Sequence, residues 1–176
     1  MSRTPDNAEF KAINIAILTV SDSRTEETDS SGRLLVERLT EQGHQLAEKK
    51  IVIDDVYQLR ADVSRWIADD AVQAVIITGG TGMTGRDVTP EAMRPLFDKE
   101  IEGFGEVFRF LSLDDIGTST VQSRALGGVA NATLIFCVPG SSGACELAWD
   151  GILQHQLDSR TKPCNFVNLI PRLKER

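Results

Sequence analysis

The sequence predicts an α/β protein, a three-layer α/β/α sandwich around a mainly parallel sheet. Short apolar segments rich in β-branched residues alternate along the chain with longer segments of helical periodicity. Some of the short segments are almost continuously apolar, which is typical of parallel strands covered on both faces. The 176 residues are 41% hydrophobic and 26% charged, as in one ordinary globular domain. We expect this single domain over residues 13–163, after a flexible N-terminus (1–12) and before a C-terminal tail (164–176).

The first predicted strand, residues 13–20, is a nearly unbroken apolar run. A polar loop then leads to a helix in which Leu35 and Leu39 recur at helical spacing, and Gly43 is expected to end it. A weaker strand follows at about 45–53. Each of these elements therefore has its own local signal.

The middle of the chain repeats this order. Residues 56–67 carry one apolar stripe on an otherwise polar helix, and residues 74–78 form another buried strand. Gly79 and Gly80 stop that strand. A further helix is expected to begin at Thr89, a hydroxyl N-cap, with Pro90 in its first turn.

The second half adds a helix, a hairpin and a last helix. Residues 104–111 place apolar side chains at i, i+3, i+4 and i+7. Residues 126–129 and 133–138 are expected to pair as a hairpin around Asn131. The last helix carries Cys145, Ala148, Trp149 and Ile152 on one face.

Composition and charge exclude several classes of protein. The chain has 19 Lys+Arg against 26 Asp+Glu and no basic run outside the short tail Arg172–Arg176, so a nucleic-acid partner is not expected. No apolar run approaches the roughly 20 residues of a membrane span, and no signal-peptide core is present, so we expect a cytoplasmic protein. The three cysteines form no C-x-x-C pair, which argues against a disulfide framework or zinc site. Cys137 and Cys145 are expected in the core, and His44 and His155 at the surface.

The chemistry is expected where the parallel strands end, because ligands of open α/β sheets bind beyond the carboxyl ends of the strands. The predicted strands 13–20, 45–53, 74–78 and 133–138 are each followed by a polar, acidic or glycine-rich stretch. These stretches are Ser21-Asp22-Ser23-Arg24, Asp54-Asp55, Gly79 to Asp87, and Pro139-Gly140-Ser141-Ser142-Gly143. We expect them to converge on one edge of the sheet.

The loop from Gly79 to Asp87 has four glycines in its first seven residues. It formally matches the dinucleotide fingerprint G-x-G-x-x-G and nearly matches the P-loop. The next helix begins several residues too late for the first motif, and Arg86-Asp87 replaces the Lys-Ser/Thr of the second. What remains is a loop whose amides approach phosphate or a polar heterocycle, or else a long turn that needs positive φ.

Four aspartates near these loops admit two interpretations each. Asp87 suits Mg²⁺ held together with phosphate oxygens, or a carboxylate favoured at a helix start. Asp54 and Asp55 either bind a metal or end a strand, and Asp22 either binds a ligand or caps a turn. Arg109 and Arg124 are candidate anion clamps or surface ion-pair partners. No G-x-S-x-G nucleophile elbow occurs.

Several motifs in fixed order resemble the MoaB/MogA family of molybdenum-cofactor biosynthesis proteins. The resemblance covers about residues 13–163 and is closest to the MoaB-type members. Its motifs are Thr78-Gly-Gly-Thr-Gly82, Arg86-Asp-Val-Thr-Pro-Glu91, Gly103-Phe-Gly-Glu-Val-Phe-Arg109, Asp115-Ile-Gly-Thr-Ser-Thr120, Ser123-Arg124, Pro139-Gly-Ser141 and Thr161-Lys-Pro-Cys-Asn-Phe166.

The resemblance implies a molybdopterin-binding domain that assembles as a trimer or hexamer and adenylylates molybdopterin. In that reaction ATP and molybdopterin give adenylyl-molybdopterin and pyrophosphate, with Mg²⁺. Asp87 and Asp54 match the family's two functional aspartates and would be catalytic and metal-binding. Ile53 replaces a common proline, so the register between Asp54 and Asp55 is open, and Asp54 is favoured. The substrate-binding positions would be Ser21, Asp22, Gly79, Gly80, Thr81, Gly82, Thr89, Glu106, Arg109, Ser123, Pro139, Gly140 and Ser141.

Other functions stay open at this point. The second hypothesis, after the adenylyltransferase, is a molybdopterin- or nucleotide-binding carrier or assembly partner without turnover. A nicotinamide-dependent oxidoreductase would rest on G-x-G-x-x-G alone. Phe104, Phe108 and Phe110 point to more than one helical face, which predicts contact with another subunit.

Overall fold

The predicted sheet is confirmed, with six strands in the order β2-β1-β3-β6-β5-β4. The computed structural model describes residues 4–5 and 7–175. Four neighbouring strands are parallel, and the β5–β6 and β4–β5 pairs are antiparallel. The strands are β1 (Asn14–Val20), β2 (Gln45–Val52), β3 (Ala74–Thr78), β4 (Lys99–Glu100), β5 (Leu126–Ala130) and β6 (Thr133–Val138). The expected hairpin is present, and Asn131 and Ala132 form its turn at positive φ.

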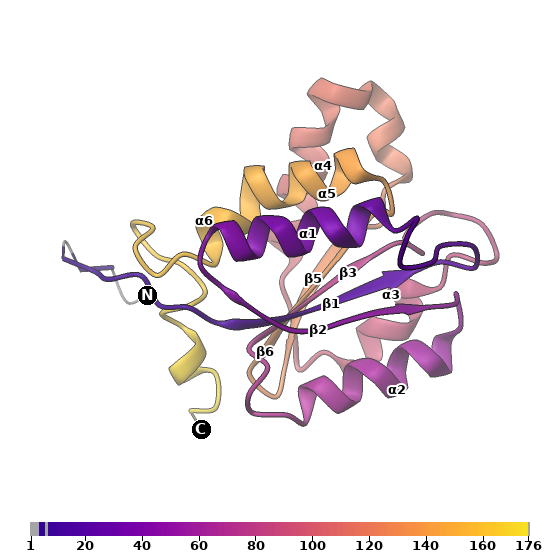
Figure 1. Cartoon of the computed structure of the whole chain (residues 1–176). Helices are drawn as coiled ribbons and strands as arrows, with labels where there is room; N and C mark the ends of the chain where they lie inside the picture. The colour runs from indigo at the N-terminus through magenta and orange to yellow at the C-terminus, as the bar shows by residue number, and fades with distance from the viewer. Residues whose placement is uncertain (1–3, 6, 176) are drawn as a thin grey trace.

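Helices cover both faces of the sheet (Figure 1). Helices α1 and α5 lie on one face with α4, whereas α2 and α3 lie on the other. The α-helices are α1 (Ser30–Glu41), α2 (Val56–Ile67), α3 (Thr89–Met93), α4 (Glu102–Ile116), α5 (Ser142–Ala148) and α6 (Gln154–Gln156). Short 3-10 turns occupy Arg94–Leu96, Gly117–Gln122 and Ile170–Arg172, and a π-helical turn spans Trp149–Leu153. The three layers are therefore α/β/α, as expected.

Side-chain alternation along the central strands divides the core in two. In β1, Ile15 and Ile17 pack under α1, α4 and α5, while Ala16 and Leu18 pack against α2 and α3. All four are fully buried. Burying a side chain of the size of Ile or Leu contributes about 1.5–3 kcal/mol, so both faces of β1 stabilise the sandwich.

The helix starts differ in how they are capped. The Asp29 carboxylate accepts from Gly32 N at the start of α1. The expected Thr89 N-cap is wrong, because Val88 is the N-cap of α3 and makes no side-chain cap bond. The Thr89 hydroxyl instead donates to Gly79 O at 2.8 Å, so it supports the glycine loop rather than the helix.

The prediction that His44 lies at the surface is also wrong. Its side chain is buried, and its Nδ1 accepts from Ile13 N. The ring lies between Phe10 and Trp149, with centroid distances of 5.1 and 6.4 Å. An isolated histidine in the sequence gives no sign of the aromatic contacts that cover it. His155 is exposed and Cys137 and Cys145 are buried, as predicted.

Segments outside 13–163 also contact the domain. Thr4 N donates to Pro163 O, and the Phe166 ring packs 5.8 Å from the ring of Phe136. Val167 is buried in the core cluster under α1 and α5. Among the described residues no helix has the length and apolar character needed to cross a bilayer.

Candidate functional site

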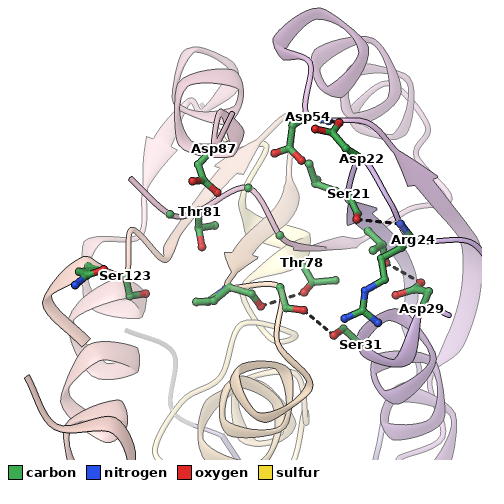
Figure 2. Close-up of a pocket in the computed structure, with 18 of the residues that line it drawn as sticks. Ser21, Asp22, Arg24, Asp29, Ser31, Asp54, Thr78, Thr81, Asp87 and Ser123 are labelled. Atoms are coloured by element: carbon green, nitrogen blue, oxygen red, sulfur yellow. Dashed lines mark hydrogen bonds between the residues drawn. The ribbon is translucent and has the colours of Figure 1, made fainter. Parts of the chain in front are cut away.

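A cavity of about 500 Å³ opens where β1, β3 and β6 end (Figure 2). Its walls come from the loops after these strands, from the segment after β2, and from the 3-10 turn after α4. The predicted convergence of polar and glycine-rich loops on one sheet edge is therefore what the fold produces.

The glycine loop passes directly over the end of β1. Gly79 and Gly80 have φ of 104° and 63°, in the left-handed region that favours glycine. A β-carbon at Gly79 would lie 2.2 Å from Val20 O, and one at Gly80 would lie 2.4 Å from Thr89 Oγ1. Both conformation and space therefore require glycine here.

Asp54 lines the cavity with an unsatisfied carboxylate. Its Oδ1 is buried and has no hydrogen-bond partner among the described residues. Burial raises the pKa of Asp54 above its ordinary value, and the negative charges of Asp22 and Asp87 raise it further. Asp55 instead caps α2 by accepting from Tyr57 N and Gln58 N. Asp54 therefore faces the cavity, whereas Asp55 caps a helix.

Asp87 is held ready in its ionised form. Its Oδ2 accepts from Thr84 N at 2.8 Å and from Thr84 Oγ1 at 2.6 Å. The hydrogen bond from the Thr84 hydroxyl lowers the pKa of Asp87, and the backbone amides of Thr84 and Gly82 lower it further. The carboxylate lies over Gly82, where a β-carbon would be 2.7 Å from Oδ2.

Asp22 forms an ion pair with Arg86 across the mouth of the site. Arg86 Nε and Nη2 both donate to the Asp22 carboxylate, at 2.9 and 2.7 Å. These bonds lower the pKa of Asp22. The turn after β1 is capped by Ser21, whose Oγ accepts from Ser23 N and Arg24 N, so Asp22 is not needed for it.

Hydrogen-bond donors gather at the opposite end of the cavity. Arg24 is the one cation among the described residues that line it. Its Nη1 donates to Thr28 O and Ser30 Oγ near the N-terminus of α1, and the Ser31 hydroxyl donates to Gly140 O. Figure 2 shows Asp54, Asp22 and Asp87 at one end and Arg24 and Ser31 at the other. The cavity is therefore acidic at one end and cationic at the other.

One further carboxylate, that of Asp29, lies near Arg24, but its negative charge is paired with Lys49. Burial would raise the pKa of Asp29, yet hydrogen bonds from Lys49, Gly32 and Thr19 lower it. Lys49 Nζ lies 2.8 Å from Asp29 Oδ2. This buried pair leaves the charge of Arg24 available to a ligand.

Not every predicted site residue reaches this cavity. Glu106 and Arg109 line a second cavity of about 450 Å³, which shares Ser123 with the first. Thr89 is buried below the glycine loop, and Ser141 caps α5. The predicted residues that do line the first cavity are Ser21, Asp22, Asp54, Gly79, Gly80, Thr81, Gly82, Asp87, Ser123, Pro139 and Gly140.

Other lining residues were missed by sequence reasoning. Arg24 belongs to the polar stretch after the first strand, Ser21 to Arg24, so its positive charge there could have indicated an anion-binding residue. Ser31 on α1 had none, because tertiary packing alone brings it to the cavity. Ile116, the last residue of α4, and Ser119, in the turn after it, lie within the Asp115–Thr120 motif of the family resemblance, but that motif was not assigned to the site. No group of three or more His, Cys, Asp or Glu residues that could hold a metal occurs in the part of the chain that is described.

The chain matches known proteins over most of its length. Residues 16–159 match the family model described as "Probable molybdopterin binding domain". Molybdenum cofactor biosynthesis protein B of Escherichia coli (strain K12) is 59% identical over 169 residues, covering 96% of this chain and 98% of that protein. The Bacillus subtilis (strain 168) protein of the same name is 46% identical over 146 residues, covering 82% and 86%.

Solved structures agree with the sequence matches. A crystal structure of a molybdenum cofactor biosynthesis protein B has a TM-score of 0.81 and 47% identity, covering 84% of this chain and 92% of that one. The tungsten cofactor synthesizing protein MoaB from Pyrococcus furiosus has a TM-score of 0.74 and 35% identity, covering 82% and 92%. The match of family model, relatives and fold places this chain in the MoaB/MogA family of molybdopterin-binding domains.

Proposed function

We propose that this protein acts in molybdenum cofactor biosynthesis by adenylylating molybdopterin with Mg-ATP. Family membership supports the pathway and the pterin ligand. The observation that carries the proposed reaction is the pair Asp54 and Asp87, each lying on a glycine of one loop at the acidic end of the cavity. Such a pair suits transfer of a phosphoryl-type group, where charge must be neutralised and oriented.

The acidic end fits Mg²⁺ on the chemistry of its donors. Mg²⁺ prefers oxygen ligands and commonly takes one or two carboxylates together with substrate phosphates. The buried Asp54 Oδ1, after β2, lacks a hydrogen-bond partner among the described residues, and Asp87, in the loop after β3, is held ionised at the same end of the cavity (Figure 2). Asp54 and Asp87 would hold the ion, which would neutralise charge on the triphosphate.

No protein nucleophile is required for this reaction. A terminal phosphate oxygen of molybdopterin attacks the α-phosphorus of ATP, and the bond from that phosphorus to the oxygen bridging to the β-phosphate breaks. Pyrophosphate leaves with that oxygen and its electron pair. The chain would orient both substrates, with backbone N–H groups of the glycine loop near the phosphates and Arg24 bound to an anionic group at the far end.

Exposed apolar residues on α4 and the turn after it support self-association as a trimer or hexamer. The Phe110 side chain is 72% exposed and Val121 is 79% exposed. Val107, Leu113 and Ile116 on the same segment are also exposed. A cluster of large apolar side chains open to solvent is typical of a surface that another subunit covers.

Pyrophosphate release from Mg-ATP tests the reaction directly. It would be measured with and without molybdopterin, for the wild type and for Asp87→Asn side by side. Release that requires molybdopterin and disappears in Asp87→Asn is the expected result. Molybdopterin binding without release by the wild type would overturn the transferase and leave a pterin-binding protein without turnover.

A further inference from the structure

We propose that Arg124 is a positioning residue that fixes the glycine loop so that Asp87 faces the cavity. Arg124 lies between the two cavities but lines only the second, on the far side of the loop from the proposed reaction. It therefore acts through the loop and not on the substrates in the first cavity. The inference rests on the proposed function for its kinetic consequence.

All three guanidinium nitrogens of Arg124 are engaged. Nε donates to Gly82 O at 2.7 Å and Nη2 donates to Asp87 O at 2.8 Å. Nη1 forms an ion pair with Glu91, in the first turn of α3. The backbone of Arg124 also binds the glycine loop, since Arg124 N donates to Thr81 O at 3.2 Å.

These contacts join both ends of the exposed part of the loop. Residues 83–86 are exposed, and inside the loop the bonds between Thr84 and Asp87 are local. Arg124 donates to the carbonyl oxygen of Gly82, just before this segment, and to that of Asp87, just after it. The Asp87 carbonyl oxygen is thereby turned toward Arg124 while its carboxylate lines the first cavity.

A planar fork is needed for this task. Arginine presents its donors in a rigid plane, whereas lysine offers one mobile point charge. The Arg124 side chain is 26% exposed, and Glu91 neutralises it at the edge of the second cavity. Lysine at this position would keep the charge but would bind only part of the set of Gly82 O, Asp87 O and Glu91.

Arg60 provides a matched control. Its Nε and Nη2 donate to Ala92 O and Glu91 O, so it also binds backbone carbonyls of α3 with a guanidinium. It makes no hydrogen bond with the glycine loop in the described structure. Loss of Arg60 therefore costs comparable contacts to α3 without releasing residues 82–87.

The test compares Arg124→Ala, Arg124→Lys and Arg60→Ala in pyrophosphate release and in amide hydrogen exchange. Arg124→Ala should lower kcat by about 10- to 100-fold with little change in the KM for molybdopterin, since displaced catalytic groups cost rates of this size. Arg124→Lys should show most of that loss, and added guanidinium ion should restore part of the activity of Arg124→Ala. Arg60→Ala should stay close to the wild type.

Hydrogen exchange separates this inference from the proposed reaction. Amides of residues 82–87 should exchange faster in Arg124→Ala and not in Arg60→Ala, whether or not the wild type releases pyrophosphate. Unchanged exchange in that segment would overturn the positioning role. So would a higher KM with unchanged kcat, because Arg124 would then bind substrate directly.

Discussion

The Asp54 carboxylate lies against Gly80, where a β-carbon would stand only 2.6 Å from Asp54 Oδ1. The acidic end of the cavity is therefore built by close approach between a carboxylate after β2 and a backbone after β3. Asp87 lies against Gly82 in the same way, because a β-carbon at Gly82 would stand 2.7 Å from Asp87 Oδ2. The glycines of this loop make room for acidic groups as well as allowing unusual backbone angles.

Gly80→Ala is expected to damage both stability and activity. Alanine at φ of 63° costs about 1–2 kcal/mol, and its methyl group would collide with Thr89 Oγ1 and Asp54 Oδ1. Displacement of Asp54 should lower turnover by about 100-fold. Urea unfolding and pyrophosphate release measure the two effects.

Gly85→Ala is the control for that substitution. A β-carbon at Gly85 would meet nothing within 4 Å, and its φ lies outside the left-handed region. It should retain the activity and stability of the wild type. Equal turnover of Gly80→Ala and Gly85→Ala would show that Gly80 has no role in placing Asp54.

Asp54→Asn should lose activity and gain stability. The change removes a carboxylate that burial and the charges of Asp22 and Asp87 make unfavourable, while turnover should fall by about 100- to 1,000-fold. Because the pKa of Asp54 is raised in the folded state, the wild type loses stability as pH rises through that pKa. The gain in melting temperature should therefore be present at pH 7 and absent at acid pH.

Asp55→Asn decides between the neighbouring aspartates. Asn caps helices about as well as Asp, so α2 should remain intact and activity should change little. A large loss of turnover in Asp55→Asn with normal turnover in Asp54→Asn would reverse the assignment.

Arg24→Ala should weaken binding of an anionic substrate at the cationic end of the cavity. A charge-assisted hydrogen bond contributes about 1.5–3 kcal/mol, so the KM for molybdopterin or ATP should rise about 10- to 100-fold. Arg33→Ala removes an exposed guanidinium from α1 outside the cavity and should leave both KM values unchanged. Unchanged KM values for both substrates in Arg24→Ala would exclude anion binding at this end.

Stability is expected to fall as pH decreases below 6.5 because of His44. Burial lowers the pKa of His44 from its ordinary 6.5, against the opposing charge of Asp158. Below that value the unfolded chain takes up a proton that the folded His44 does not, at a cost of up to about 1.4 kcal/mol per pH unit.

Urea unfolding between pH 7.5 and 5.5 measures this slope. His44→Asn, which keeps an acceptor for Ile13 N, should flatten it. His155→Asn changes an exposed histidine and should keep the wild-type slope. A slope that persists in His44→Asn would assign the pH dependence to other groups.

Phe110→Asp is expected to dissociate the proposed oligomer. It places a charge in the exposed apolar cluster on α4, where a covering subunit would have to desolvate it. Tyr57→Asp is the matched control, because Tyr57 is an aromatic residue 76% exposed on α2. Light scattering at micromolar concentration should give a trimer or hexamer for the wild type and Tyr57→Asp, and a monomer for Phe110→Asp. A monomeric wild type would refute self-association.

The fold was predictable because most elements carry a local signal. The continuous apolar run of residues 13–20 indicated β1, and Asn131 between two apolar segments indicated the β5–β6 hairpin. The shape of the cavity was only partly predictable. Ile116, at the end of α4, and Ser119, in the turn after it, reach the cavity through tertiary packing, which no spacing in the sequence reports.

Two errors have a shared physical cause. His44 and Thr89 each have a polar side chain whose partner lies far away in the chain or on its backbone, at Ile13 N and Gly79 O. Rules based on residue type place a lone histidine at the surface and a threonine at a helix cap. Tertiary hydrogen bonds override both rules.

The three cysteines lie in different parts of the fold, and this gives the protein internal markers for unfolding. Cys164 is half-buried, whereas Cys145 lies below the cavity floor with its Sγ 3.1 Å from Thr78 Oγ1, and burial raises the pKa of its thiol to about 11. Cys137 is enclosed within β6 of the sheet. A thiol-reactive dye should therefore label Cys164 first, Cys145 when α5 lifts away, and Cys137 when the sheet separates. Labelling rates would then distinguish opening of the cavity floor from loss of the whole fold.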